Sequence, residues 1–190
     1  MKKIRTGWIV AGVIIVFVLI LVSSVVGKYN SLVLANENIN GKWSEVENNL
    51  QRRADLIPNL VNTVKGYASH EQEIFTEIAD ARSRLIGAKG VDETASANAG
   101  LSSALSRLLA ISEAYPALKA DQNFRALQDE LAGTENRIKF ARQDYNAAVQ
   151  SYNGMIKSFP TNIAAKIFGY GEREYFEAED AARNVPKVEF

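Results

Sequence analysis

The stretch that decides the fold runs from Trp43 to Val64 and reads WSEVENNLQRRADLIPNLVNTV. Its apolar residues recur at alternating steps of three and four, which places them on one face of a helix that packs against other helices. The same register continues to Ala88 and returns from Phe124 to Phe159. No run alternates with a period of two for long enough to form a sheet. The sequence therefore predicts an all-α fold built on long helices.

Two residues interrupt the first of these helices, over residues 43–88. Pro58 removes one backbone donor, so we expect a kink there. Gly66 marks either a bend or a true break between two helices. The apolar register keeps its phase across Gly66, which favours a bend.

The remaining helices are predicted from their end signals. Asp92 is expected to cap a helix over about residues 93–113, and Asp121 to cap a helix that Pro160 ends. Thr161 is expected to cap a short helix that Gly169 closes. Together these elements predict an antiparallel bundle of the four-helix type.

A charge-free apolar run precedes the bundle, from Gly7 to Val26. Twenty helical residues rise about 30 Å, the thickness of the hydrocarbon core of a membrane. Trp8 and Tyr29 flank the run, where aromatic rings prefer the membrane interface. A cleaved signal peptide is the alternative, with Val22-Ser23-Ser24 as a weak cleavage site. The length of the run favours a retained single-pass anchor.

The flanking charges predict the orientation of this anchor. Lys2, Lys3 and Arg5 precede the run, and only Lys28 follows it closely. Positive flanks stay on the cytoplasmic side, so we expect a cytoplasmic N-terminus and an extracytoplasmic bundle. The predicted organisation is a cytoplasmic stub and transmembrane helix over 1–29, a helical bundle over 30–169 and an extended tail over 170–190.

Composition excludes several classes of protein. The chain has 190 residues, no cysteine and one histidine, so disulfide scaffolds, cysteine-ligated metals and multi-histidine sites are excluded. Lys and Arg total 22, as do Asp and Glu, so no basic excess indicates nucleic acid. The pair His70-Glu71 lacks the second histidine of a metalloprotease helix and is expected to cap a helix near Gly66. We predict no cofactor and no metal site.

Three segments resemble the bacterial LemA family. They are Gln51-Arg52-Arg53-Ala54-Asp55-Leu56-Ile57-Pro58-Asn59-Leu60-Val61 through Lys65-Gly66-Tyr67-Ala68-Ser69-His70-Glu71, then Ala141-Arg142-Gln143-Asp144-Tyr145-Asn146 with Tyr152-Asn153, and finally Phe159-Pro160-Thr161-Asn162 through Tyr175-Phe176 to the Val185–Phe190 terminus. The resemblance covers residues 30–190. It implies a single-pass membrane protein with an antiparallel helical bundle, and it implies no particular reaction.

Arg53 is the sharpest candidate site, because it lies on the apolar face beside Arg52 and Asp55. An unpaired guanidinium would be costly there, so a buried ion pair is predicted, with Glu71 as first partner and Asp144 or Glu135 as alternatives. A pocket for a ligand or partner around Arg53 is the functional alternative.

Other polar residues are predicted to act inside the bundle or at the tail. Asn59 and Asn62, with Asn146 and Asn153, are candidates for an amide network, the alternative being solvated surface amides. Val188 and Phe190 are expected to dock the C-terminal tail, with Pro186 holding it extended.

Three classes of function remain open. The first is a non-enzymatic membrane-anchored scaffold that self-associates as a homo-oligomer and contacts lipid through residues 7–26. The second is a membrane-tethered module that binds a partner protein or cell-envelope component. The third is an enzyme with an unfamiliar site, which the lack of phosphate loops and nucleophile motifs disfavours.

Overall fold

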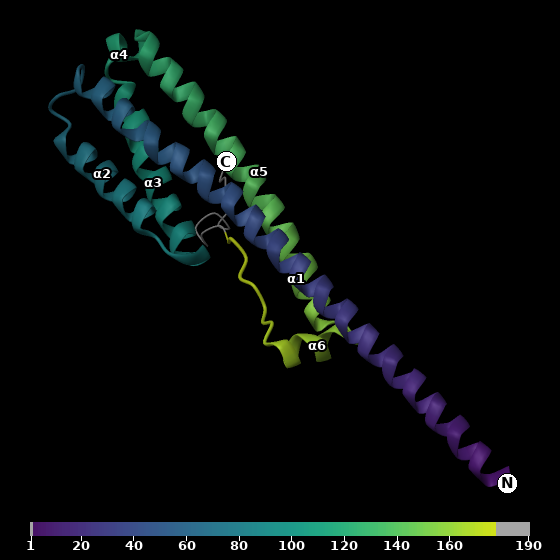
Figure 1. Cartoon of the computed structure of the whole chain (residues 1–190). Coiled ribbons are helices and arrows are strands. Elements are labelled where there is room, and N and C mark those ends of the chain that lie inside the picture. The colour runs from purple at the N-terminus through teal and green to yellow at the C-terminus, as the bar shows by residue number, and fades with distance from the viewer. Residues whose placement is uncertain (1, 178–190) are drawn as a thin grey trace, which may run out of the picture. The chain divides into compact units, whose positions relative to one another are not determined.

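The computed structural model describes residues 2–177, with side chains from residue 7 onward, and shows six helices in that range. They are α1 Lys2–Lys65, α2 Gln72–Gly87, α3 Gly90–Ser112, α4 Pro116–Ala120, α5 Gln122–Lys157 and α6 Thr161–Phe168 (Figure 1). No β-strand occurs among residues 2–177. The prediction of an all-α chain is therefore confirmed.

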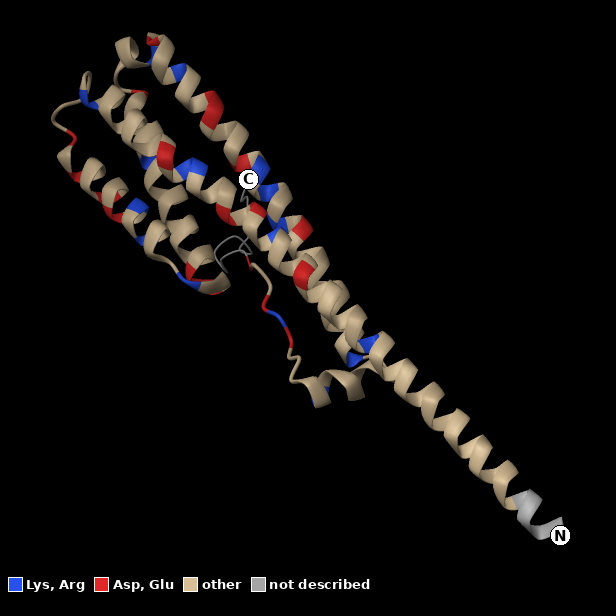
Figure 2. Cartoon of the chain, viewed as in Figure 1, with Lys and Arg blue, Asp and Glu red and all other residues tan. Residues whose placement is uncertain are grey.

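The helix α1 carries both the apolar run and the first part of the apolar face. No loop separates the two, so the predicted boundary between residues 29 and 30 lies inside a helix. Figure 2 shows a long tan stretch of α1 without any Lys, Arg, Asp or Glu, and this stretch corresponds to the apolar run. Its large apolar side chains from Trp8 to Val26 are exposed, by 38% to 79%. This segment is long and apolar enough to cross a membrane.

The chain forms two compact units. Within the described residues, unit 1 contains residues 2–40 and 147–173, and unit 2 contains residues 41–146 and 174–177.

Unit 2 buries the predicted apolar face. Buried positions of α1 and α5 follow the three-and-four spacing at Val46, Leu50, Arg53, Ile57, Leu60, Val64, Phe124, Thr134, Ile138, Ala141 and Tyr145, and Ala54 beside Arg53 is buried as well. The helices α2 and α3 contact each other, and α2 also reaches α1, where Arg82 Nε donates to the carbonyl oxygen of Ala54 at 2.8 Å. Most of the apolar face within unit 2 is therefore buried by the same chain.

The helix breaks at Gly66, and the expected bend is wrong. The helix α1 ends at Lys65, and the backbone N–H groups of Tyr67 and Ala68 both donate to the carbonyl oxygen of Val64 at 2.9 Å. A new helix, α2, begins at Gln72 and buries Ile74. The register survives because residues on both sides of the turn face the same core. Pro58 lies inside α1, which continues through it.

The end signals are confirmed in part. Asp121 Oδ1 accepts the backbone N–H of Phe124 at 2.8 Å at the start of α5, and Gly169 closes α6 with a φ of 75°. Asp92 is not the cap of α3: the N-cap is Lys89, whose N–H donates to Glu93 Oε2 at 2.9 Å. Thr161 is the first residue of α6 and makes no capping hydrogen bond. Local signals therefore placed these helices correctly but misassigned two caps.

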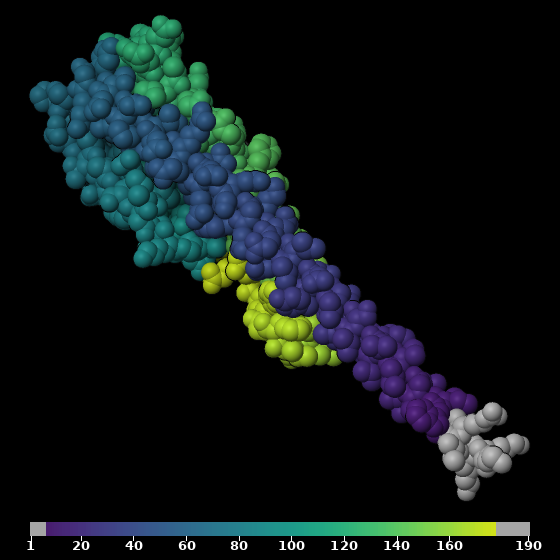
Figure 3. Space-filling model, viewed as in Figure 1, coloured from purple at the N-terminus to yellow at the C-terminus, as the bar shows by residue number. Residues whose placement is uncertain are grey.

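Unit 1 packs the middle of α1 with the end of α5 and with α6. Its buried core consists of Leu32, Ile39, Val149, Tyr152, Asn153, Ile156, Thr161, Ala164 and Ala165. Figure 3 shows α6, in yellow, against the blue-purple part of α1. The Phe168 and Tyr29 ring centroids lie 4.6 Å apart.

Candidate functional site

The Arg53 side chain is buried and paired within unit 2. It is 7% exposed, and its Nη1 lies 2.7 Å from Glu135 Oε2 on α5 and donates to Asn98 Oδ1 on α3 at 2.8 Å. Burial lowers the pKa of the Arg53 guanidinium below its ordinary value, and the negative charge of Glu135 opposes that shift. An arginine stays protonated even so. The side chain therefore ties three helices together through a charge-assisted contact.

The predicted first partner of Arg53 is wrong. Glu71 lies in the turn after α1, where its Oε1 accepts the Tyr115 hydroxyl at 3.0 Å. That hydrogen bond to Glu71 raises the pKa of Tyr115 above its ordinary value. The break at Gly66 explains the difference, because the chain turns back and leaves Glu71 at the far end of α1. Glu135, an alternative partner from the sequence, is the one that the structure selects.

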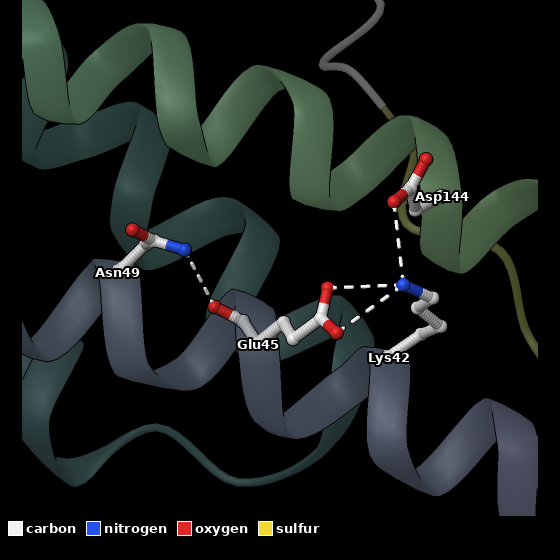
Figure 4. Close-up of polar contacts among 4 residues, drawn as sticks. All are labelled: Lys42, Glu45, Asn49 and Asp144. Carbon is white, nitrogen blue, oxygen red and sulfur yellow. Dashed lines mark hydrogen bonds and ion pairs between the residues drawn. The ribbon is translucent and has the colours of Figure 1, made fainter.

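Asp144, the second expected partner, belongs to a different cluster (Figure 4). Its Oδ2 lies 3.4 Å from Lys42 Nζ, which also contacts Glu45 at 3.2 Å. Asn49 Nδ2 donates to the carbonyl oxygen of Glu45 at 2.7 Å. The hydrogen bonds to Glu45 and then Asp144 raise the pKa of Lys42. This cluster is solvent-facing, so it orients side chains more than it stabilises the fold.

A groove opens beside the Arg53–Glu135 pair. Its volume is about 350 Å³, and its apolar lining comes from Leu60, Leu105, Leu109, Leu131 and Ala132. Ser102 and Ser106 also line it, but their hydroxyls donate to helix carbonyl oxygens at 3.0 and 2.9 Å. An always-charged guanidinium cannot act as a base, and the Glu135 carboxylate in the same lining is paired with that guanidinium. The groove therefore suits binding of an apolar group, because the guanidinium that lines it is already neutralised by Glu135.

The other residues predicted around Arg53 lie on the exposed face of α1. Arg52 Nη2 lies 2.8 Å from Glu130 Oε1, and this contact lowers the pKa of Glu130. Asp55 accepts the side-chain N–H of Gln51 at 2.8 Å. The side chains of Pro58 and Asn59 are exposed, and the carbonyl oxygen of Asn59 accepts the Thr63 hydroxyl. These residues do not assemble into one site with Arg53.

His70 does not cap a helix. Its side chain is exposed in the turn between α1 and α2 and makes no hydrogen bond within residues 2–177. The N-cap of α2 is Glu71, without a side-chain capping bond. Among the described residues, no cluster of three His, Cys, Asp or Glu is arranged to hold a metal ion.

Asn146 and Asn153 bind the backbone of the tail, and the expected amide network among the asparagines is wrong. In unit 2, Asn146 accepts the N–H of Phe176 at 2.8 Å and donates to its carbonyl oxygen at 3.0 Å. In unit 1, Asn153 does the same with Arg173, at 2.9 Å in both directions. Each side-chain amide thus makes with one tail residue the two hydrogen bonds that a neighbouring β-strand would make with it.

Tyr145 and Trp43 complete the tail contact in unit 2. The Tyr145 hydroxyl donates to the carbonyl oxygen of Glu174 at 2.9 Å. Trp43 packs on Tyr145 and on Phe176, with ring centroids 5.3 and 6.1 Å apart. The Arg142 guanidinium lies 4.3 Å from the Phe176 ring centroid. Val188 and Phe190, predicted to dock the end of the tail, lie outside the described residues.

Sequence reasoning missed two elements of this arrangement. Asn98 is a polar residue on the buried face of α3, four and three residues from Thr94 and Leu101. A polar residue on a buried face needs a polar partner, and this was the one signal in the sequence that pointed to Asn98. No sequence signal pairs Asn146 or Asn153 with tail residues, because the partner is backbone.

Comparison with known proteins agrees with the sequence motifs. The LemA family model matches residues 42–190. Magnetosome protein MamQ 2 of Paramagnetospirillum magneticum is 30% identical over 186 residues, covering 84% of this chain and 68% of that protein. Protein LemA of Metamycoplasma hominis is 27% identical over 160 residues, covering 83% of this chain and 73% of that protein. The matched range holds Arg53, its partners and both tail-binding asparagines, and the chain belongs to the LemA family.

Proposed function

We propose that this chain is a non-enzymatic helical scaffold that residues 7–26 anchor in the bacterial cell membrane and that self-associates there. The observation that carries the proposal is the apolar part of α1, whose large side chains are all exposed from Trp8 to Val26. Such a surface is unfavourable in water and favourable in lipid. The same helix continues into the buried face of unit 2 without a loop.

The scaffold is an antiparallel bundle of four helices, α1, α2, α3 and α5. Two ion pairs support this arrangement within unit 2, Lys42 with Asp144 and Arg52 with Glu130. From the first pair to the second, the residue number rises on α1, from Lys42 to Arg52, and falls on α5, from Asp144 to Glu130, as antiparallel helices require. The charge-assisted contact of Arg53 to Asn98 adds α3 to the same core.

Self-association is supported by apolar side chains that the chain leaves uncovered. Phe140 on α5 is 64% exposed although its neighbours Ile138 and Ala141 are buried. The anchor contains the small-residue pair Gly7-x-x-x-Ala11, a spacing that favours helix packing in lipid. Confinement to a membrane raises the effective concentration of such surfaces.

Subunit counting in lipid tests this proposal. The full-length chain, labelled at one site and reconstituted in vesicles, should bleach in more than one step at a low protein-to-lipid ratio. Phe140→Glu should shift the count toward monomer, and the adjacent exposed change Lys139→Glu should leave it unchanged. A monomeric wild-type chain at every ratio would contradict self-association.

The orientation of the anchor has its own test. We propose a cytoplasmic N-terminus and an extracytoplasmic bundle, on the basis of Lys2, Lys3 and Arg5 before the run. The chain has no cysteine, so Lys119→Cys provides a single exposed thiol on α4. An impermeant thiol reagent should label it without rupture of the inner membrane. Labelling only after that rupture would reverse the orientation.

A membrane-tethered binding module is the second candidate, and the groove beside Arg53 favours it. A partner protein or cell-envelope component with an apolar group would fit the lining leucines. Ser106→Trp should fill the groove and abolish cellular function without altering the subunit count. Unchanged cellular function in this variant would argue against the groove as a binding site.

A further inference from the structure

The short helix α6 exposes apolar side chains on one side and buries small ones on the other. Thr161, Ala164 and Ala165 are buried. Ile163 is 50% exposed, Ile167 66% and Phe168 46%, and Phe159 just before the helix is 80% exposed. Ile163 and Ile167 are four residues apart, so they lie on the same face. An exposed apolar cluster of this kind indicates a surface that another protein or a membrane covers.

The position of α6 along α1 indicates which of the two covers this cluster. The centroid of the Tyr29 ring lies 4.6 Å from that of Phe168 and 6.3 Å from that of Tyr170. Tyr29 follows Val26, the last residue of the apolar run, by three residues, or about 4.5 Å of helix. A membrane adds about 5–7 Å of headgroup layer on each side of its hydrocarbon core. Tyr29 and the ring that touches it therefore fall at headgroup depth when the run spans the membrane.

The chemistry of α6 also suits a lipid surface. Tyrosine is enriched at the boundary between lipid and water, and Tyr29 and Tyr170 supply two such rings, while Phe159 and Phe168 add apolar rings typical of the lipid-facing side of surface helices. Within residues 161–168 the one charged residue is Lys166, which is exposed and favours an anionic leaflet.

We propose that α6, together with Phe159, is an interfacial helix that binds the lipid surface next to the anchor. Ile163 and Ile167 insert at the boundary between headgroups and acyl chains, as amphipathic surface helices do. The opposite side of the helix is buried, and the Phe168 ring packs on Tyr29 of α1. This inference rests on the proposed membrane anchoring of residues 7–26 and adds a second lipid contact, about 130 residues later in the chain.

Lipid quenching of a single fluorophore tests the contact in the full-length chain. Because the chain lacks cysteine, Ile163→Cys takes one NBD label. Ile86→Cys on α2 is the matched control, since Ile86 is also an isoleucine that is 50% exposed. Val18→Cys reports separately on the anchor. The protein is reconstituted in vesicles of phosphatidylcholine and phosphatidylglycerol that contain a nitroxide-labelled lipid, with the nitroxide near the headgroup or in the acyl chain.

The proposal expects NBD at position 163 to emit further to the blue than NBD at position 86, and to be quenched severalfold more by the headgroup-proximal nitroxide. Ile167→Cys should repeat the result, which guards against a local effect of the first label. Quenching at position 18 without quenching at 163 and 167 would leave the anchor intact and overturn the interfacial helix. No quenching at position 18 would overturn both. Protection of position 163 from lipid nitroxide and from aqueous iodide alike would show that a second chain covers α6, and would also overturn the proposal.

Discussion

Replacing Arg53 by methionine should destabilise the folded chain, because Asn98 would lose its buried donor. Methionine keeps most of the aliphatic volume and removes a desolvated charge, which alone is neutral or stabilising. Asn98 is only 5% exposed, however, and its Oδ1 accepts from Arg53 Nη1 at 2.8 Å. A buried acceptor without a donor costs about 1–3 kcal/mol. Glu135 is 50% exposed and can be hydrated, so it adds little.

The expected decrease in the free energy of unfolding for Arg53→Met is therefore about 1–3 kcal/mol. If the unpaired Asn98 causes it, Asn98→Leu should cancel most of it in the double variant. The coupling between Arg53→Met and Glu135→Gln should be about 1–2 kcal/mol, since a charge-assisted hydrogen bond is strong but one partner is half exposed. This coupling should weaken only slightly with added salt.

The neighbouring pair Arg52–Glu130 provides a matched control. Its N–O distance is 2.8 Å, close to that of Arg53–Glu135, but the two side chains are 58% and 37% exposed. The cycle of Arg52→Met with Glu130→Gln should show a clearly smaller coupling that salt abolishes.

Urea unfolding of the full-length chain in detergent provides the assay. Trp8→Phe leaves Trp43 as the single tryptophan, and its packing on Tyr145 makes its fluorescence report on unit 2. Equal couplings in the two cycles would refute the argument from burial. An Arg53→Met variant as stable as the parent, with Asn98 in place, would refute the argument from the lost donor.

Three further predictions concern the tail, the start of α5 and the end of α6. Asn146→Ala should lower the free energy of unfolding by about 1–3 kcal/mol and accelerate amide exchange at Phe176, because two hydrogen bonds to Phe176 are lost. Asn146→Asp keeps one acceptor and should show a smaller effect, and unchanged exchange in both variants would count against the contact. Hydrogen bonds from the backbone N–H of Phe124 and then from the Tyr67 hydroxyl lower the pKa of Asp121, so the ionised carboxylate stabilises the fold above the ordinary aspartate pKa and this stabilisation is lost as pH falls through the lower folded value. Asp121→Asn should therefore flatten the decrease of Tm at acid pH, and an unaltered decrease would contradict this. Gly169→Ala should lower the free energy of unfolding by about 1 kcal/mol, because the φ of this residue is 75°. The control Gly154→Ala inside α5 should be neutral or stabilising in the same thermal melt, and a neutral Gly169→Ala would argue against the left-handed cap.

The sequence by itself determined the all-α class and the buried faces of the long helices. The three-and-four spacing predicts burial at Val46, Leu50 and Ile57, and all three are buried. This works because helical geometry relates residues a few positions apart, whatever the rest of the chain does. Asp121 and Gly169 were predictable for the same reason, since each acts on backbone within a few residues.

Only the tertiary structure decided which distant groups meet. The apolar register runs through Gly66 unchanged, so periodicity could not reveal that α1 ends at Lys65 and the chain turns back. Because of that reversal, Glu71 accepts a hydrogen bond from Tyr115, and Arg53 pairs with Glu135 instead. The choice among carboxylates depends on which helix packs alongside, and a spacing pattern contains no information about neighbouring helices.

The asparagines of α5 show the same limit most clearly. Asn146 binds the backbone of Phe176 within unit 2, and Asn153 binds the backbone of Arg173 within unit 1. The sequence offered only an amide network between helices or solvated surface amides for these residues. Every residue but proline offers the same backbone N–H and C=O groups, so the residue types of the tail cannot show which position an asparagine will bind. Folding selects that position, because only the packed chain brings one tail residue within hydrogen-bonding distance of each amide.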